Sequence, residues 1–293
     1  MAGFSLLRPD TFFTQATFES ILVTQAVLVV VALGVTVALA AGEFDLSVAA
    51  MLGLSAGLTA HLTANLGWPV AAALAGSFVV ATVVGITNGI FVVYFGVSSF
   101  ITTIGTSAVI GGLGVAVFGP ETIGGIPASL TDPVRQEVFG IGISALFALV
   151  LAGVLWYFLE QTPSGRHLFF TGEGREAARL AGVPVARIRF GALVISALFA
   201  WLAGVVLVGQ AGAAQVSFGQ PFLLPAFAAA FLGATTIKVG RYNAWGTVVG
   251  VYLLAVGTVG LQLLGAATWV EDVFNGATLV LAVTLARLVS RRE

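Results

Sequence analysis

Nine long apolar runs constrain the fold of this chain more than any other feature of its sequence. Each run is long enough to cross about 30 Å of hydrocarbon as an α-helix. Their approximate bounds are 21–41, 46–66, 69–93, 99–118, 139–159, 190–210, 221–237, 245–265 and 273–289. Lipid offers no partners to free backbone polar groups, so spans of this kind form helices. We therefore expect an all-α, polytopic membrane helix bundle with about nine to ten transmembrane helices.

The composition agrees with a membrane protein and excludes several kinds of chemistry. Of the 293 residues, 58% are hydrophobic and only 9% are charged, whereas soluble chains carry about 25% charged residues. We expect a single transmembrane domain over 1–293, with no soluble enzymatic domain. The absence of cysteine and the presence of two histidines argue against a metal site or a thiol centre. A nucleotide-binding Gly-x-x-x-x-Gly-Lys-Ser/Thr motif is also absent, so we expect no catalytic residue and no cofactor.

The one sizeable charged segment lies between the fifth and sixth apolar runs, at 160–189. It holds five of the twelve lysine and arginine residues: Arg166, Arg175, Arg179, Arg187 and Arg189. A basic loop that only fixes the topology would explain these charges. A short polar helix that protrudes from the membrane toward a soluble partner explains them as well.

The centre of this segment predicts a short helix with recognisable ends. Thr171 is expected to cap its first turn, and Glu173 is expected to lie near its positive end. Glu176 and Arg179 are three residues apart and can pair on one face. Gly182, with Pro184 two residues later, is expected to end the helix.

The distribution of basic residues predicts the orientation in the membrane. An odd number of spans places the termini on opposite sides, and basic residues favour the cytoplasm. A cytoplasmic C-terminus leaves only Arg8 and Arg135 outside and places 119–138 outside. The cytoplasmic segments then contain Arg166, Arg175, Arg179, Arg187, Arg189, Lys238, Arg241, Arg287, Arg291 and Arg292. We therefore expect a multi-pass membrane protein with its C-terminus in the cytoplasm.

Polar residues within or beside the apolar runs are candidates for a translocation path. A helix break is expected near 42–47, where Asp45 follows Gly42. An ionisable group at membrane depth suggests function, but an N-cap at the break explains Asp45 equally well, and both roles are compatible. Uncharged polar groups in spans suit a polar solute or interhelical hydrogen bonds. The tentative path residues are Asp45, Ser47, Asn88, Phe100, Thr102, Thr103 and Gln262.

Several motifs resemble one known family. Glu176-Ala177-Ala178 with Gly182 matches the Glu-Ala-Ala-x-x-x-Gly core of ABC importer permeases, although the Ile-x-Leu-Pro that follows it in that superfamily is absent. Five further stretches resemble ribose-type sugar permeases of that superfamily, in the same order over roughly 42–265. They are Gly42 to Val48, Asn88-Gly89 with Ser99 to Gly105, Phe231 to Thr235, Trp245 to Gly250, and Gly260 to Gly265. Two departures stand out: these permeases usually have another span before the start of this chain, and an acidic pair where it has Leu224-Pro225.

The resemblance implies a function and a set of partners. The chain would be the permease subunit, in the bacterial inner membrane, of an ABC importer that moves a monosaccharide or similar small polar solute into the cytoplasm. It would not be an enzyme, since a separate ABC ATPase would supply the energy. An extracytoplasmic solute-binding protein would deliver the solute, a second permease copy or homologue would complete a dimer in the lipid, and no nucleic acid would bind.

The resemblance also assigns the protruding helix as a coupling helix that docks on the ATPase. The residues so assigned are Gly172, Glu173, Gly174, Arg175, Glu176, Ala177, Ala178, Arg179, Leu180 and Gly182. The alternative function is an ion-coupled secondary transporter, which would need carboxylates or histidine relays in mid-span. Few acids lie near the spans, namely Glu43, Asp45, Glu160, Glu271 and Asp272.

Overall fold

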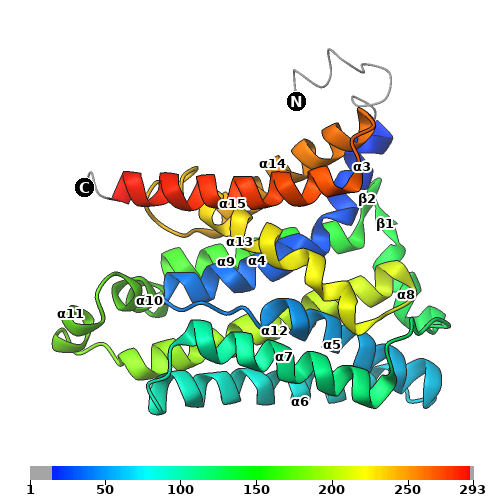
Figure 1. Ribbon diagram of the computed structural model, residues 1–293, viewed down its shortest axis with the longest axis horizontal. Coiled ribbons are helices and arrows are strands. Elements are labelled where there is room, and N and C mark those ends of the chain that lie inside the picture. The colour runs from blue at the N-terminus through cyan, green and yellow to red at the C-terminus, as the bar shows by residue number, and fades with distance from the viewer. Residues whose placement is uncertain (1–14, 291–293) are drawn as a thin grey trace.

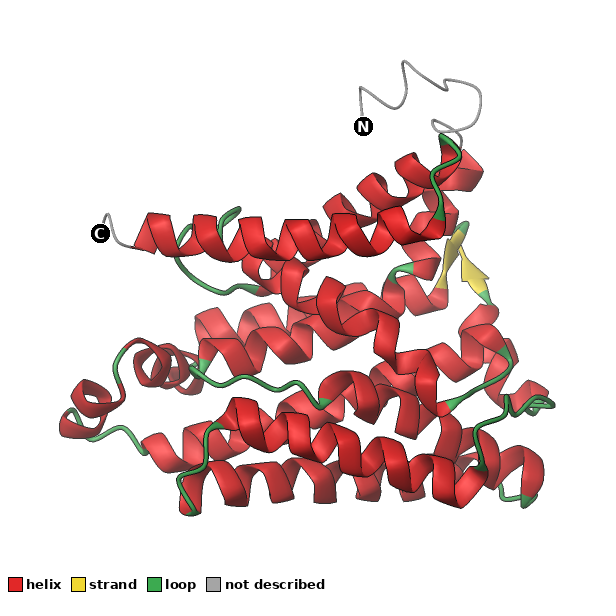
Figure 2. Cartoon of the chain, in the orientation of Figure 1, coloured by secondary structure: helices red, strands yellow, loops and turns green. Residues whose placement is uncertain are grey.

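The computed structural model describes residues 15–290, and its helices run roughly side by side along the long axis of the molecule (Figures 1 and 2). The only strands among these residues form one small hairpin. The all-α bundle expected from the sequence is therefore confirmed. Arg8, Arg291 and Arg292 of the charge distribution lie outside the described residues.

The amino-terminal half contains six α-helices and two short π-helical turns. In chain order they are α3 (Gln15–Thr24), α4 (Ala26–Ala40), α5 (Val48–Ala60), η1 (His61–Asn65), α6 (Val70–Gly89), η2 (Ile90–Tyr94), α7 (Ser99–Phe118) and α8 (Ala128–Arg135). The expected break near 42–47 is present, because α4 ends at Ala40 and α5 begins at Val48. Figure 1 shows this segment returning from the end of α4 toward the middle of the bundle, where α5 starts.

The carboxy-terminal half begins with the hairpin. The elements are β1 (Glu137–Val138), β2 (Ile141–Gly142), α9 (Ile143–Gln161), α10 (Pro163–Glu173), α11 (Arg175–Leu180), α12 (Val185–Ala211), the 3₁₀-helix η3 (Val216–Phe222), α13 (Leu223–Gly233), α14 (Ala244–Leu263) and α15 (Thr268–Ser290). The predicted run 139–159 therefore starts too early. Phe139 and Gly140 both have positive φ, 54° and 77°, and such a pair makes the tight turn that a two-residue hairpin requires.

Seven helices among the described residues are long and apolar enough to cross a membrane. They are Val70–Tyr94, Ser99–Phe118, Ile143–Gln161, Val185–Ala211, Val216–Gly233, Ala244–Leu263 and Trp269–Ala286. The pair α3–α4, bent by 42°, becomes an eighth if it counts as one span. The helical stretch α5–η1 covers the predicted run 46–66 but is not among these helices. Each predicted run thus contains a helix, while the count of nine to ten spans stays a prediction.

The centre of the bundle is α4, all fifteen residues of which are buried. A helix that is apolar all round belongs in an interior position. Small residues let neighbouring helices approach closely, as is usual between membrane helices. Gly85 and Gly89 of α6 face Val194 and Phe190 of α12, and Gly250 of α14 meets the backbone of Ala229 in α13.

The two ends of the bundle differ in character. Figure 1 places α10, α11 and the last turns of α15 at one end, and α8 and the hairpin at the other. We refer to these as the α11 end and the α8 end. The opposite placement of 119–138 and 160–189 along the bundle agrees with the expected topology.

Candidate functional site

The charged segment at the α11 end folds as two helices rather than one. Thr162 caps α10, accepting a hydrogen bond from the Gly165 amide at 3.1 Å, and Pro163 occupies the first turn. The expected cap at Thr171 is wrong: this residue is buried inside α10, and its hydroxyl donates to the His167 carbonyl at 2.8 Å. Glu173 ends α10 instead of starting a helix. Proline at the first position allows the helix to begin nine residues earlier than a cap at Thr171 suggested.

The second helix, α11, is the six-residue piece that the sequence marks as the coupling helix. It follows Gly174 and ends before Gly182, whose φ of +82° favours glycine. Glu176 and Arg179 lie 3.9 Å apart as expected, but both are well exposed, so their pairing contributes little to stability. Leu180 is 87% exposed. An apolar side chain of this exposure, beside a carboxylate and a guanidinium, gives α11 a mixed surface suited to a protein partner.

The unwound segment 41–47 places three polar side chains inside the bundle: Glu43, Asp45 and Ser47 are each only 1% exposed. Non-helical backbone at membrane depth needs partners from neighbouring protein. The segment finds them on α7, where Ser99 accepts from the Phe44 amide at 3.1 Å and Thr103 accepts from the Leu46 amide at 3.0 Å. The Thr103 hydroxyl lies within donating distance, 3.2 Å, of the Phe44 carbonyl. Two side chains of α7 thus hold the backbone of this segment in place.

A chain of side-chain hydrogen bonds continues from this segment. Asp45 accepts from the Ser47 amide at 3.0 Å and from the Ser47 hydroxyl at 2.5 Å. Asn88 of α6 donates to the Ser47 hydroxyl at 3.0 Å, and Thr106 of α7 donates to Asn88 at 2.7 Å. The N-cap of α5 is Ser47, without a side-chain capping bond, so the N-cap expected at Asp45 is wrong. The Asp45 carboxylate instead closes a local turn onto Ser47. It also belongs to a buried polar network in an otherwise apolar core.

The remaining path candidates are placed differently. Phe100 is half-exposed on α7, and the Thr102 hydroxyl is buried without a hydrogen-bond partner in the described part of the chain. Gln262 lies apart from the others, near α3, where it donates to Glu271 at 3.0 Å and lines a separate pocket of about 560 Å³. Thr106 was missed by the sequence analysis. Its spacing from Ser99 and Thr103 could have identified it, because the three residues share one face of α7.

The most consequential contact joins the charged segment 160–189 to the unwound segment 41–47. The Glu43 carboxylate accepts from Arg175 of α11 at 2.7 Å and also pairs with Arg189 of α12. Arg175 donates in addition to the Gly42 carbonyl at 2.9 Å. Glu43 was not among the predicted site residues, and Arg175 was expected to face the ATPase. The sequence gives no signal for a pair separated by 132 positions.

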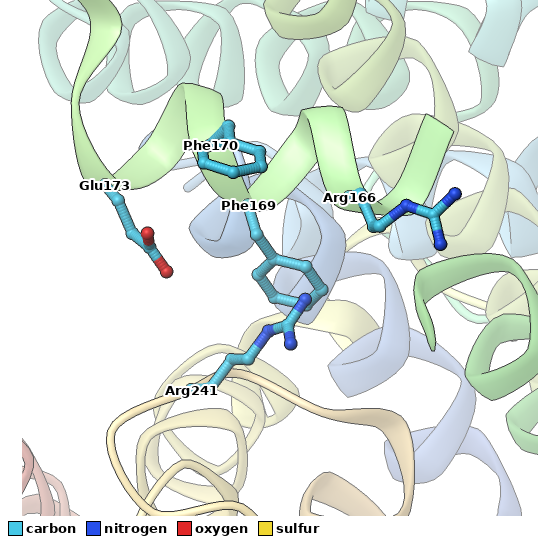
Figure 3. A pocket seen from close by; sticks show the side chains of 5 residues that line it. All are labelled: Arg166, Phe169, Phe170, Glu173 and Arg241. Carbon is cyan, nitrogen blue, oxygen red and sulfur yellow. The ribbon is translucent and has the colours of Figure 1, made fainter. Parts of the chain in front are cut away.

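A pocket of about 220 Å³ lies beside α10 (Figure 3). Its lining consists of Arg166, Phe169, Phe170, Glu173 and Arg241. The Arg241 guanidinium carbon lies 3.6 Å from the centre of the Phe169 ring, a close cation–π contact. Nearby in sequence, Lys238 pairs with Glu160 at 2.7 Å. The α11 end thus gathers basic side chains from α10 and from the segment between α13 and α14.

A metal centre finds no support in the described residues, which contain no group of three or more histidine, cysteine, aspartate or glutamate side chains suited to a metal ion. The polar groups inside the bundle are carboxylate, hydroxyl and amide. Such groups form hydrogen bonds with a polar molecule.

Comparison with known proteins identifies one family. The family described as "Branched-chain amino acid transport system / permease component" matches residues 17–283. The chain is 32% identical to the autoinducer 2 import system permease protein LsrD of Photorhabdus laumondii over 260 residues, which cover 87% of this chain and 78% of that protein. The LsrD protein of Yersinia pseudotuberculosis is 30% identical over the same shares of the two chains. No solved structure matches the chain.

Proposed function

The chain belongs to the family described as "Branched-chain amino acid transport system / permease component", and we propose that it carries a monosaccharide or similar small polar solute into the cytoplasm. It is the membrane-embedded permease of an ABC importer, like the import system permeases it resembles. Its role is that of a pore subunit. In our proposal, the energy comes from ATP hydrolysis on a separate ABC ATPase, and a solute-binding protein and a second permease copy or homologue complete the assembly.

The observation that supports this proposal best is the exposed helix α11, bound directly to a segment that enters the bundle. Its outward residues, Glu176, Arg179 and Leu180, have few contacts of their own. We assign ATPase docking to 172–182, the residues given above as the coupling helix. Its location at the same end of the bundle as the last turns of α15 supports the proposal that both lie on the cytoplasmic side.

We assign the solute path to the surroundings of 41–47. Asp45, Ser47, Asn88 and Thr103 meet there, with Thr102 and Phe100 on the same helix as Thr103. Hydroxyl and amide groups lining a route suit a solute rich in hydroxyl groups. Gln262 lies away from this cluster near α3, and we assign it to the outer mouth of the path.

The solute class rests on the sequence motifs more than on the names of relatives. The family description names branched-chain amino acids, and the relatives named above are permeases for autoinducer 2. The ribose-type motifs around Asp45 and Asn88 favour a sugar.

The direct test is transport by the reconstituted assembly. The chain, its cognate ATPase and its solute-binding protein would be placed in liposomes and offered radiolabelled ribose or leucine. We expect ribose uptake that requires ATP on the side of the liposome membrane where the ATPase is bound. Uptake of leucine alone would contradict the sugar assignment, whereas uptake driven by an ion gradient without the ATPase would contradict the ABC assignment.

The orientation has its own test, because the chain contains no cysteine. Ser129 of α8 and Ser164 of α10 are both exposed and lie at opposite ends of the bundle. We expect Ser129→Cys to react with a membrane-impermeant maleimide in intact cells, and Ser164→Cys to react only after permeabilisation. The reverse pattern would invert the topology.

A further inference from the structure

Building on the function proposed above, we propose that Glu43 is a latch that transmits movement of α11 to the unwound segment 41–47. In this latch Arg175 is the contact that moves and Arg189 is the fixed counter-charge. The ribose-type motif has glycine where this chain has Glu43, so the family resemblance does not imply such a latch.

The first support is the burial of the charge. The Glu43 side chain is 1% exposed, and an ionised carboxylate in such a position is costly unless it is paired. Two guanidinium groups from different helices share it. Losing both would leave an uncompensated buried charge, whereas losing one leaves a pair. The carboxylate can therefore release one partner and stay buried.

The second support is the difference between the two arginines. The Arg175 side chain is 47% exposed, whereas that of Arg189 is 16% exposed. Arg175 is the first residue of α11, a six-residue helix flanked by Gly174 and Gly182, and Arg189 lies within the 27-residue helix α12. Arg175 is thus on the short, accessible element, and Arg189 is on the long, packed one.

The third support is the backbone contact behind the ion pair. A Cβ atom on Gly172 would lie 2.3 Å from the Ala40 carbonyl oxygen and 3.2 Å from the Gly42 amide nitrogen. Because backbone meets backbone, the end of α10 cannot move toward Ala40 without displacing the start of the unwound segment. The Arg175 hydrogen bond to the Gly42 carbonyl reinforces the same junction.

Hydrogen bonds link the unwound segment, beyond this junction, to two helices of the bundle. Phe44 and Leu46 are bonded to α7, and Ser47 is bonded to Asn88 of α6. A displacement of Glu43 therefore acts on α6 and α7 through a segment of five residues. Spatial continuity alone does not establish energetic coupling, so the test must measure coupling.

The test uses the reconstituted importer and two readouts. Glu43→Gln removes the charge but keeps the side-chain shape. We expect ATP hydrolysis within about twofold of the wild type and ribose uptake lowered by about tenfold, within the range usual for coupling between sites. Glu160→Gln, which breaks the Lys238–Glu160 pair at the same end, is the matched control and should leave uptake per ATP unchanged. A parallel fall of hydrolysis and uptake would mean a purely structural role and would overturn the latch.

A double-mutant cycle tests whether Glu43 acts through Arg175. If it does, Glu43→Gln combined with Arg175→Gln should lower uptake no further than Glu43→Gln alone, because contacting residues give non-additive effects. Additive losses would overturn the latch.

A labelling experiment covers the case in which Glu43→Gln fails to fold. Arg175→Gln leaves the Glu43–Arg189 pair intact and should fold. Phe44 is 42% exposed on the unwound segment, so the thiol of Phe44→Cys is a reporter of its position. We expect nucleotide to change the labelling rate in the wild-type background and to have no effect with Arg175→Gln. A response retained with Arg175→Gln would overturn the latch, whereas absence of ATP-dependent uptake by the wild type would instead overturn the proposed function.

Discussion

Gly172→Ala should sharply lower solute uptake while leaving insertion into the membrane intact. The added Cβ would lie 2.3 Å from the carbonyl oxygen of Ala40, a backbone atom that cannot rotate away. Overpacking of this kind costs about 1–3 kcal/mol, equivalent to about 5–150-fold in an equilibrium. Because Arg175 follows three residues later, pushing α10 away also separates Arg175 from Glu43. We therefore expect uptake by the reconstituted importer to fall within that range.

The matched control for this substitution is Gly191→Ala on α12, where a Cβ would meet no atom within 4 Å. Both variants replace a glycine close to the α11 end, but only Gly172→Ala introduces a steric clash. Equal uptake by the two variants would show that α10 does not have to sit against Ala40.

Gly219→Ala should have the largest effect on stability. Its Cβ would lie 1.9 Å from the Ala49 carbonyl oxygen and 2.8 Å from the Gly53 amide nitrogen. The contact is reciprocal, since a Cβ on Gly53 would lie 2.0 Å from the Val216 carbonyl oxygen. The helices α5 and η3 therefore touch through their backbones, and we expect the free energy of unfolding to fall by about 3 kcal/mol or more.

Thermal unfolding in detergent, followed by size-exclusion chromatography, measures this effect. Gly112→Ala on α7 is the comparison, because a Cβ there would meet nothing within 4 Å. In an open helical position alanine is favoured over glycine by up to about 1 kcal/mol, so this variant should be as stable as the wild type or more stable. An unchanged midpoint for Gly219→Ala would contradict the close packing of α5 on η3.

The apolar elements of this fold could be predicted from the sequence because lipid leaves the backbone few choices. Each of the nine runs contains a helix, and the break before Val48 is signalled by Gly42 and Asp45. The limits of single elements were less predictable. Thr171 looked like a cap, but Thr162 and Pro163 start α10 earlier, and the loop-like appearance of Pro163 to Gly165 concealed a first helical turn.

The long-range contacts of the site could not be predicted, for a different reason. Asp45, Ser47 and Asn88 were identified separately, and they meet because α5 and α6 pack together. The Glu43–Arg175 pair depends on how α10 folds back onto the end of α4, which no local pattern reports. Gln262 had the same polar character as the other candidates and lies elsewhere.

The complete burial of α4 has a consequence for the membrane in which this protein works. In the outward helices α7 and α15, only 17% and 11% of the most apolar stretch is buried inside the chain. The rest of their surface is therefore available to contact acyl chains or a neighbouring subunit. No acyl chain reaches α4, because all of its residues are buried inside the chain. A thicker or thinner bilayer is therefore accommodated by tilting of the outer helices, while α4 keeps its position at the centre.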